Sequence, residues 1–359
     1  MTDKDFDDVK GIGPKTAGKV NDAGMTWESL AISSVNDVAS RTGLSDDKAK
    51  TLVDEARDLT DTGGFKTGTQ VAKEQEQMKK IPFFVDSLDE LLGGGVRQGK
   101  LTEIYGENSS GKSQMCFQLA VNVQLPESIG GPEESCIFID TEDTFTPNRI
   151  GQMVKGLDPE ILEAVLEARG FDDITVDDVK ESELISANNP QTPADRVHQS
   201  FMDNISVAKA LNSDHQQELA QLAKGMAAEI EDNPDMLDPG LLVVDSLIKH
   251  FRAEYVGRGE LSNRQQKLNK HISDLQQFSD LYKSAVVYPN QVAANPDSFF
   301  GDPTKATGGN IVGHASTYRL YLNIKKDPLR SAKLMDAPDM ETEKCVFSVV
   351  RDGIKGENY

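Results

Sequence analysis

The 359-residue chain contains few cysteines, and their placement excludes the redox and metal-binding classes that depend on them. Cys116, Cys136 and Cys345 are odd in number and far apart, with no C-x-x-C pair and no histidine cluster of metal-ligand spacing. A disulfide framework or a zinc site is therefore not expected. We predict that the three thiols are reduced core residues.

Long apolar runs are also missing. No stretch approaches the roughly 20 residues that a membrane-spanning helix requires. The first eight residues contain four aspartates, where a signal peptide would be basic and then apolar. We expect a soluble, cytoplasmic protein with no membrane partner.

Positive charge is scarce, with 38 Lys and Arg against 59 Asp and Glu and a net charge of −21. Such a balance ordinarily argues against a nucleic-acid partner, which needs a basic footprint. The distribution is uneven, however, because residues 157–240 hold 19 acidic and five basic side chains, whereas residues 251–330 hold seven acidic and 11 basic ones. An acidic surface that spares one strip indicates a protein kept soluble in concentrated salt that still needs cations at one place. We therefore hypothesise a halophilic source.

A phosphate-binding motif is the clearest positive signal. Residues 106–113 fit G-x-x-x-x-G-K-[ST] between a strand-like run and a helical pattern. In this motif the backbone N–H groups surround phosphates, the lysine reaches the β- and γ-phosphates, and the hydroxyl binds Mg²⁺. ATP or GTP with Mg²⁺ is therefore the expected ligand. The predicted nucleotide-binding residues here are Gly106, Glu107, Asn108, Ser109, Ser110, Gly111, Lys112, Ser113 and Gln114, and Ser113 is also a predicted metal ligand.

Short apolar runs alternate with helical patterns from residue 81 onward, which predicts an α/β fold with a mostly parallel central sheet. The candidate strands are residues 101–105, 135–139, 241–244, 284–288, 317–324 and 345–350. The first four are typical of strands buried on both faces of a parallel sheet. Residues 261–282 repeat apolar side chains every three or four positions, which predicts a long helix with one buried face.

Polar side chains follow these strands at their carboxyl ends, where open α/β sheets bind ligands. Asp245 fits the acidic residue that supports Mg²⁺. Glu142 is the predicted general base that activates water for γ-phosphate hydrolysis, although Asp140 could exchange roles with it. Gln291 is suited to sensing the γ-phosphate, because its neutral amide does not compete for the metal. The predicted catalytic residues are thus Glu142, Lys112 and Gln291.

Residues 1–60 form a predicted small helical domain. Its segment 9–20 resembles a helix-hairpin-helix, in which backbone N–H groups and lysines, here Lys10 and Lys15, contact DNA phosphates. A helical module that binds only protein is the alternative.

Residues 61–80 carry too few apolar side chains to build a core and are predicted to be a linker. Within it, the isolated Phe65 either packs on its own domain or inserts into a neighbouring subunit. The nucleotide-binding core then occupies residues 81–359. We interpret the acidic region at about 157–240 as a solvated insertion in that core.

Two loops, 252–264 and 292–314, lie near the predicted sensor and are rich in glycine. They combine cations, aromatic rings and flexible backbone, as single-stranded DNA binding requires, although ordinary surface loops are the alternative. The second loop is too rich in glycine and proline for regular structure. The predicted DNA-binding residues are Arg252, Tyr255, Arg258, Arg264, Phe299, Phe300 and Lys305.

Over nearly its whole length the chain resembles the archaeal RadA branch of the RecA family of recombinases. The residues that carry this resemblance are the helix-hairpin-helix, the phosphate loop, Leu88–Gly95, Phe251–Gly259 and Phe299–Pro303. The resemblance implies a RecA-like P-loop ATPase that uses ATP, assembles as a helical filament or ring on single- and double-stranded DNA, and exchanges strands in recombinational repair. It also implies contacts with recombination mediators.

The same resemblance assigns roles to four further positions. Arg149 is expected near the adenine, and Asp336 and Pro338 are expected to cap the ATP of the adjacent subunit. Phe65 is expected to enter a pocket on the next subunit.

The chain departs from the family pattern at Asn108–Ser109, Thr146, Pro289 and Gly68, none of which removes a catalytic group. Pro289 cannot donate a backbone hydrogen bond, which would alter coupling between Gln291 and the second loop. An ATP-binding paralogue that regulates a true recombinase and a helicase ring therefore stay as alternatives.

Salt dependence gives a first test. If about five DNA phosphates are neutralised, raising salt from about 0.15 M to about 3 M costs on the order of four decades of affinity. Stacking is less sensitive to salt. We expect Tyr255→Ala to lower DNA affinity at about 3 M KCl more than Arg258→Ala does, as measured by fluorescence anisotropy. Equal or opposite losses would contradict a binding mode based on stacking.

Overall fold

The structure is a computed structural model that describes residues 4–60, 64–231, 233–234, 236–294, 304–308 and 310–358. The chain divides into two compact units, Met1–Gln77 and Met78–Tyr359. Within the described ranges, no helix is both long and apolar enough to cross a bilayer.

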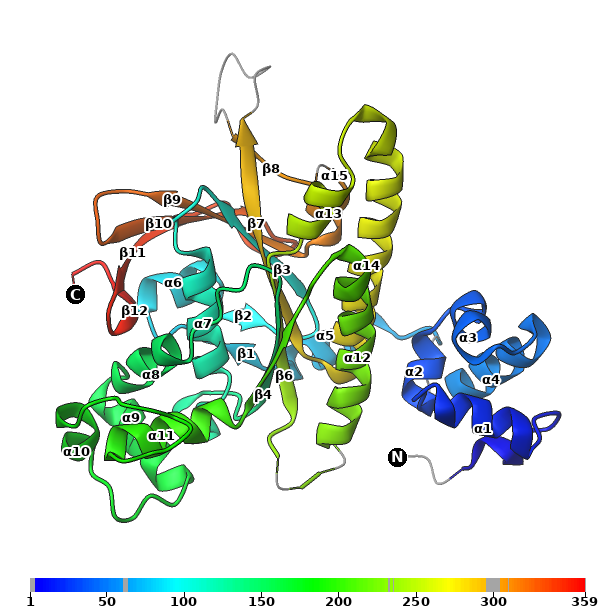
Figure 1. Cartoon of the computed structure of the whole chain (residues 1–359), viewed down its shortest axis with the longest axis horizontal. Coiled ribbons are helices and arrows are strands. Elements are labelled where there is room, and N and C mark those ends of the chain that lie inside the picture. Colours follow the sequence, from blue (N-terminus) through cyan, green and yellow to red (C-terminus); the bar gives the residue numbers. More distant parts are fainter. Residues whose placement is uncertain are drawn as a thin grey trace. The chain divides into compact units, whose positions relative to one another are not determined.

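The first unit is all helical (Figure 1). Its core includes Val20, Leu30 and Leu52, which are fully buried. The helix Gly68–Gln77 contains no buried residue, so the predicted linker is helical in part and exposed along this helix. The elements are η1 (Phe6–Asp8), α1 (Pro14–Asp22), α2 (Trp27–Ile32), α3 (Val35–Thr42), α4 (Asp46–Leu59) and α5 (Gly68–Gln77).

The second unit is built on one large sheet with the strand order β12-β11-β10-β9-β3-β7-β6-β4-β5. The strands from β9 to β5 in this order pair in parallel, and those from β9 to β12 pair antiparallel. The strands are β1 (Lys80–Ile81), β2 (Val96–Arg97), β3 (Leu101–Gly106), β4 (Ser135–Asp140), β5 (Ile205–Lys209), β6 (Pro239–Asp245), β7 (Ala285–Ala294), β8 (Thr304–Ala306), β9 (Tyr318–Ile324), β10 (Leu329–Asp336), β11 (Lys344–Val350) and β12 (Gly353–Gly356).

Helices cover both faces of this sheet, with α7 and α8 on one side and α12 and α14 on the other (Figure 1). The strands supply side chains to both cores: in β3, Ile104 faces the first core and Leu101 the second. This explains the apolar runs of the parallel strands. The helices are α6 (Asp86–Leu91), α7 (Lys112–Asn122), η2 (Glu127–Ile129), α8 (Pro147–Lys155), α9 (Pro159–Ala168), α10 (Val176–Glu181), α11 (Pro193–Met202), α12 (Ser213–Glu231), α13 (Lys249–Glu254), η3 (Arg258–Glu260), α14 (Leu261–Tyr282) and α15 (Asn310–Ala315).

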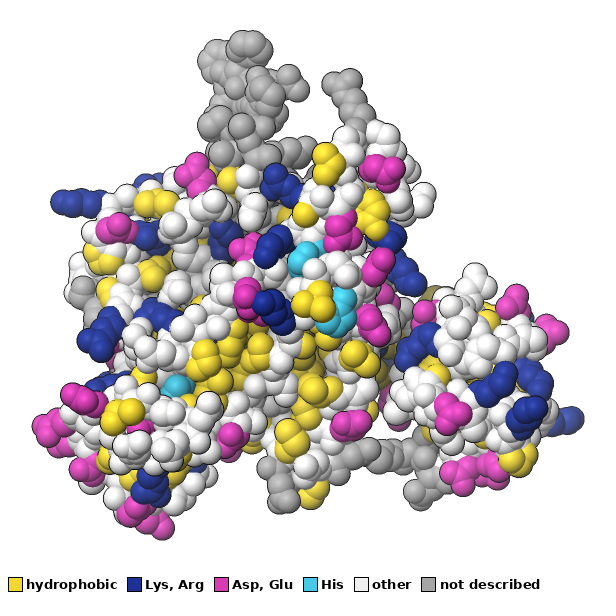
Figure 2. Space-filling view, in the orientation of Figure 1, with side chains coloured by type: hydrophobic (Ala, Val, Ile, Leu, Met, Phe, Trp, Pro, Cys, Tyr) yellow, Lys and Arg dark blue, Asp and Glu magenta, His cyan; other side chains and the backbone are white. Residues whose placement is uncertain are grey.

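The acidic region 157–240 is not a solvated insertion, and this interpretation has to be corrected. It supplies β5, which pairs with β4 in the main sheet, and α12, whose Ala220, Ala223 and Ala227 are buried in the second core. Apart from the buried Asp195, the acidic side chains of α9 to α11 are exposed on helices that bury an apolar face, and Figure 2 shows acidic side chains over these helices. The high content of charged residues made the periodic apolar pattern of these helices hard to recognise in the sequence.

The segment after Gln291 is more regular than its composition predicts. Strand β7 runs to Ala294, beyond its predicted end, and pairs antiparallel with β8 before α15 follows. Figure 1 shows β7 extending past its neighbours. The run Asn295–Pro303, which contains both prolines of the predicted loop, lies outside the described residues.

A buried charge connects three strands of the sheet. Glu103 on β3 is fully buried, and its Oε2 accepts a hydrogen bond from Nε of Arg319 on β9 at 2.6 Å. Its Oε1 accepts one from Nδ2 of Asn290 on β7 at 2.7 Å, and the same Nδ2 donates to the carbonyl of Thr307 at 2.6 Å. A carboxylate at this depth is tolerated only because both oxygens are paired.

We expect Glu103→Ala to lower the free energy of unfolding by about 3 to 5 kcal/mol, because it leaves Arg319 and Asn290 without their partner. Asp173→Ala is the matched control, since it breaks the exposed pair with Arg196 and should cost about 1 kcal/mol or less. Urea unfolding followed by circular dichroism measures both. Similar losses would show that the buried pair is not a structural requirement.

Candidate nucleotide site and DNA-facing elements

The phosphate loop connects the end of β3 to the start of α7. Ser109 and Gly111 have positive φ angles of 63° and 102°. A Cβ on Gly106 would collide with the carbonyl oxygen of Leu322, so this position requires glycine. Lys112 Nζ donates to the carbonyls of Gly106 at 3.0 Å and Glu107 at 2.7 Å, which holds the ammonium over the loop.

A cavity of about 500 Å³ opens beside this loop, a volume that suits a small-molecule ligand. It brings together most of the predicted phosphate-loop residues with the predicted base, the predicted metal ligand and the predicted sensor, which come from four strands. Sequence reasoning did not single out Ser246, Arg330 or Val349. The lining residues are Asn108, Ser109, Gly111, Lys112, Ser113, Gln114, Glu142, Asp245, Ser246, Gln291, Arg330 and Val349.

Burial away from water shifts the pKa values of two charged side chains in the cavity. Burial lowers the pKa of Lys112, and the carboxylates of Asp245 and Glu142 oppose that shift. Burial also raises the pKa of Asp245 to about 6, with a hydrogen bond from Ser113 acting in the opposite direction. Charges interact more strongly in a site of low dielectric. An anionic ligand with its cation would therefore experience a strong local field from these groups.

The residues fit a magnesium ion. Asp245 Oδ2 is buried and has no hydrogen-bond partner among the described residues, so it is available to metal-bound water. No group of three or more His, Cys, Asp or Glu side chains in the described ranges could hold a metal by itself. Mg²⁺ commonly takes one or two protein ligands and completes its shell with phosphate and water, which agrees with Ser113 and Asp245 as the protein side of the site.

The structure separates the roles of the two carboxylates after β4. Asp140 Oδ1 accepts the N–H groups of Glu142 at 2.9 Å and Asp143 at 2.8 Å. Its Oδ2 accepts those of Thr144 and Phe145, both at 2.9 Å. Four backbone donors occupy this carboxylate, so Asp140 shapes the loop, which favours Glu142 as the predicted base.

Glu142 is held by one of its oxygens. Its Oε1 accepts a hydrogen bond from Ser246 Oγ at 2.8 Å and a longer one from Gln291 Nε2 at 3.4 Å. Ser246 is itself fixed, because its N–H donates to Thr141 Oγ1 at 2.7 Å. Among the described residues, no hydrogen bond is formed by Oε2, which leaves this oxygen for the water that the predicted base would activate. The sequence signal for Ser246 was its place directly after Asp245 at a strand end.

Six predicted nucleotide-site residues do not line the cavity: Gly106, Glu107 and Ser110 of the phosphate loop, and Arg149, Asp336 and Pro338. Arg149 on α8 donates from Nε to Gln114 Oε1 at 2.6 Å and from Nη2 to the carbonyl of Val350 at 2.7 Å. It therefore reaches the cavity through Gln114. Asp336 and Pro338 are exposed at the end of β10, and their action on an adjacent subunit stays a prediction.

The first predicted DNA loop is mostly helical. Arg252 on α13 is exposed, and its Nη1 donates to Gln291 Oε1 at 3.2 Å. Tyr255 is half-buried against the second core, with Lys267 Nζ 5.2 Å from its ring centre. Arg264 is half-buried on α14, and Arg258 belongs to η3.

The remaining predicted DNA-binding residues lie in β8, in the first unit or outside the described residues. Lys305 belongs to β8, whereas Phe299 and Phe300 lie outside the described residues. In the first unit, Lys10 and Lys15 are exposed, Lys10 just before α1 and Lys15 in its first turn.

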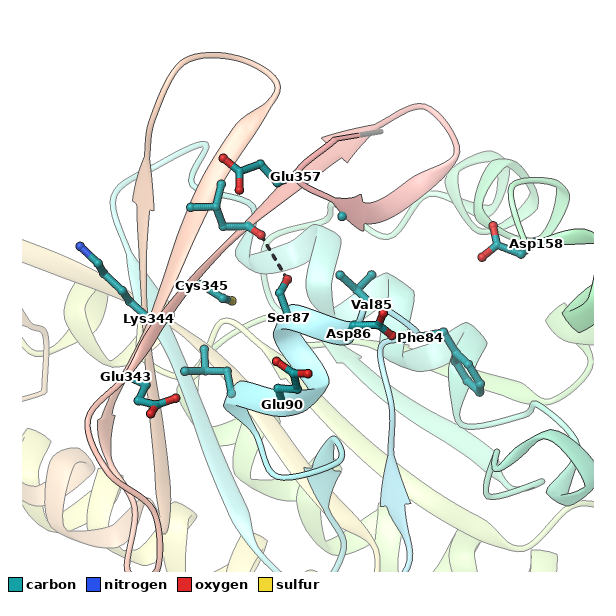
Figure 3. A pocket seen from close by; sticks show the side chains of 13 residues that line it. Phe84, Val85, Asp86, Ser87, Glu90, Asp158, Glu343, Lys344, Cys345 and Glu357 are labelled. Atoms are coloured by element: carbon teal, nitrogen blue, oxygen red, sulfur yellow. Dashed lines mark hydrogen bonds between the residues drawn. The ribbon is translucent and has the colours of Figure 1, made fainter.

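A second cavity, of about 770 Å³, lies between α6, β11 and the end of β12 (Figure 3). The carboxylates of Asp86, Glu90, Glu343 and Glu357 surround Ser87, whose hydroxyl donates to the carbonyl of Val346 at 3.2 Å. It is larger than the nucleotide cavity and shares no lining residue with it. Its acidic lining would repel phosphates, so size does not identify the nucleotide site.

The Rad51 family model matches residues 74–188 and 194–357. The chain belongs to the Rad51 family. A model of the SAM-like helix-hairpin-helix tandem matches residues 3–58. These matches confirm the predicted RecA-like core and the helix-hairpin-helix domain, and the acidic region falls within the Rad51 match except for residues 189–193.

Full-length relatives of this Rad51-family chain include the following archaeal proteins. The DNA repair and recombination protein RadA of Halobacterium salinarum is 45% identical over 358 residues, which cover 99% of this chain and 100% of the relative. The protein of the same name from Haloquadratum walsbyi is 45% identical over 359 residues, with the same coverage. That of Methanocorpusculum labreanum is 41% identical over 356 residues, or 99% of both chains. The resemblance to archaeal RadA proteins is confirmed.

We expect Glu142→Gln to reduce ATP turnover by about 10²- to 10⁴-fold while ATP affinity changes little, because the amide keeps the shape but cannot accept a proton. Turnover is measured by phosphate release and affinity by titration with a fluorescent ATP analogue. Asp140→Asn, which loses charge on the loop-shaping carboxylate, should instead weaken both. A Glu142→Gln variant with near-normal turnover would exclude this residue as the base.

Proposed function

We propose that the chain is a DNA-dependent ATPase that forms a nucleoprotein filament on single-stranded DNA and catalyses homologous pairing and strand exchange in recombinational repair. The observation that carries this proposal is a single contact series that joins the predicted base Glu142, the sensor Gln291 and Arg252 of the first DNA loop. In an ATPase whose turnover is not linked to DNA, a cation from the first DNA loop would not need to contact the residue that senses the γ-phosphate.

ATP is placed by the phosphate loop, with Lys112 and the backbone N–H groups at its phosphates. Ser113 and Asp245 would hold Mg²⁺ on the protein side. The bound ion would neutralise part of the phosphate charge. Glu142 orients the attacking water and accepts its proton, while Gln291 detects the γ-phosphate. Arg330, which lines the same cavity and is fixed by an ion pair with Asp327 at 2.7 Å, adds a further cation beside the phosphate loop.

Filament assembly is supported by an exposed aromatic residue and an exposed apolar surface. Phe65 is fully exposed, with a relative accessibility of 110%, in the polar segment before α5. Strand β5 is the last strand of the sheet, and Figure 2 shows hydrophobic side chains exposed over the β4 and α12 side of the unit. We propose that Phe65 of one subunit docks on this surface of the next. The exposed apolar residues there are Val207, Leu211, Leu222 and Met226.

The helix-hairpin-helix is assigned to DNA by its exposed lysines Lys10 and Lys15. We keep residues 61–80 as the linker between it and the ATPase core, because α5 buries no side chain. Recombination mediators are proposed partners, and the cytoplasm, where archaeal DNA lies, is the proposed location.

Joint-molecule formation tests the proposal against its rivals. The wild-type chain, with ATP and Mg²⁺ at high salt, should pair circular single-stranded DNA with homologous linear duplex into products of reduced gel mobility. Normal ATP turnover without joint molecules would favour a regulatory paralogue. Unwinding of one polarity without homology would favour a helicase ring.

The variant Phe65→Ala tests the proposed role of this residue in filament assembly. It should keep ATP binding, because the phosphate loop is untouched, and lose both filaments in electron micrographs and joint molecules. Filaments of normal length in this variant would reject the docking role of Phe65.

A further inference from the structure

The side-chain amide of Gln291 lies between two charged groups. Its Oε1 accepts a hydrogen bond from Arg252 Nη1 at 3.2 Å, and its Nε2 faces Glu142 Oε1 at 3.4 Å. A guanidinium can only donate and a carboxylate can only accept, so this is the one amide orientation that satisfies both neighbours. Arg252 therefore fixes which way the sensor points.

The backbone of Gln291 is held much more firmly than its side chain. Its carbonyl accepts hydrogen bonds from the N–H and the hydroxyl of Thr307 at 2.8 and 2.6 Å. Its N–H donates to Asn290 Oδ1 at 2.8 Å, and Asn290 is in turn bonded to the buried Glu103. Only the amide can turn while these contacts persist, so a change at Arg252 acts on the amide alone.

Arg252 is exposed at the surface end of this series. Its present acceptor is a neutral amide, whereas a DNA phosphate carries a full negative charge and can accept two parallel N–H bonds from a guanidinium. DNA at the first loop would therefore take the guanidinium from Gln291. The amide would lose the partner that orients it toward Glu142 and become free to turn toward a γ-phosphate.

We propose that Arg252 is a positioning residue that couples DNA occupancy to the nucleotide site through Gln291, in addition to contacting DNA. The inference rests on the proposed function, because it assumes that the first loop binds DNA. Coupling of this kind is reciprocal: nucleotide strengthens DNA binding by the same factor as DNA strengthens nucleotide binding. A residue that only contacts phosphate adds affinity without changing that factor.

The test is the ratio of two dissociation constants. Binding of a labelled poly-dT oligonucleotide is measured by anisotropy with and without a non-hydrolysable ATP analogue. Measured allosteric couplings are roughly 5- to 150-fold, and we expect the wild type in that range. Arg252→Ala should bring the ratio close to one. Arg264→Ala is the control on the same side of the molecule and should weaken both constants equally, leaving the ratio unchanged.

A double variant separates coupling from lost contact. Gln291→Ala should also bring the ratio near one, and adding Arg252→Ala should then weaken DNA binding with no further change in the ratio. If Arg252→Ala binds too weakly, lower salt restores measurable affinity. The analogue's affinity with and without DNA gives the reciprocal readout.

Two outcomes count against different claims. A wild-type ratio retained in Arg252→Ala overturns the coupling role and leaves Arg252 as a phosphate contact. A wild type that does not bind poly-dT, or binds it without nucleotide dependence, overturns the proposed function itself.

Discussion

The nucleotide site depends on the parallel register of the central strands. Pairing of β3 with β7 places Gly106 opposite Gln291, and pairing of β4 with β6 places Asp140 opposite Asp245. A shift of either pairing by one residue would turn the side chains of the shifted strand to the other face of the sheet. The phosphate loop, the metal ligand and the sensor are therefore brought to one edge by backbone pairing, and the buried Glu103 ties β3, β7 and β9 together behind them.

Sequence patterns predicted the parts of this fold that are buried on both faces. Strands β4, β6 and β7 contain continuous apolar runs, whereas β3 is interrupted by Thr102 and Glu103, and the polar residue after each strand marked the site. Strands β5, β10 and β12 were missed because each is half-exposed or short, so polar residues interrupt its pattern. Half-exposed or short strands owe their structure to the neighbours that they pair with, which a local pattern does not contain.

Within the site, the sequence favoured Glu142 as the base but left Asp140 as an alternative. Asp140 accepts four backbone N–H groups, a feature of the folded loop that supports the choice of Glu142. Arg330 was missed for a related reason. It comes from the antiparallel side of the sheet, and only the closure of β10 against β9 brings it beside Gly111.

Pro289 shows how a departure from the family pattern can leave the sensor in place. It lies within β7, and its carbonyl accepts the N–H of Leu247 at 3.2 Å. The N–H and C=O of a strand residue point to the same side, so the missing donor also faces the chain after β6. The ladder between β6 and β7 has already ended at Val243 and Val287. Proline is tolerated where no ladder bond is needed, and the pairing of β3 with β7 continues past it to Gln291. The backbone that aligns Gln291 with the phosphate loop is thus unaffected by this substitution, and control of the sensor falls to its side-chain partners.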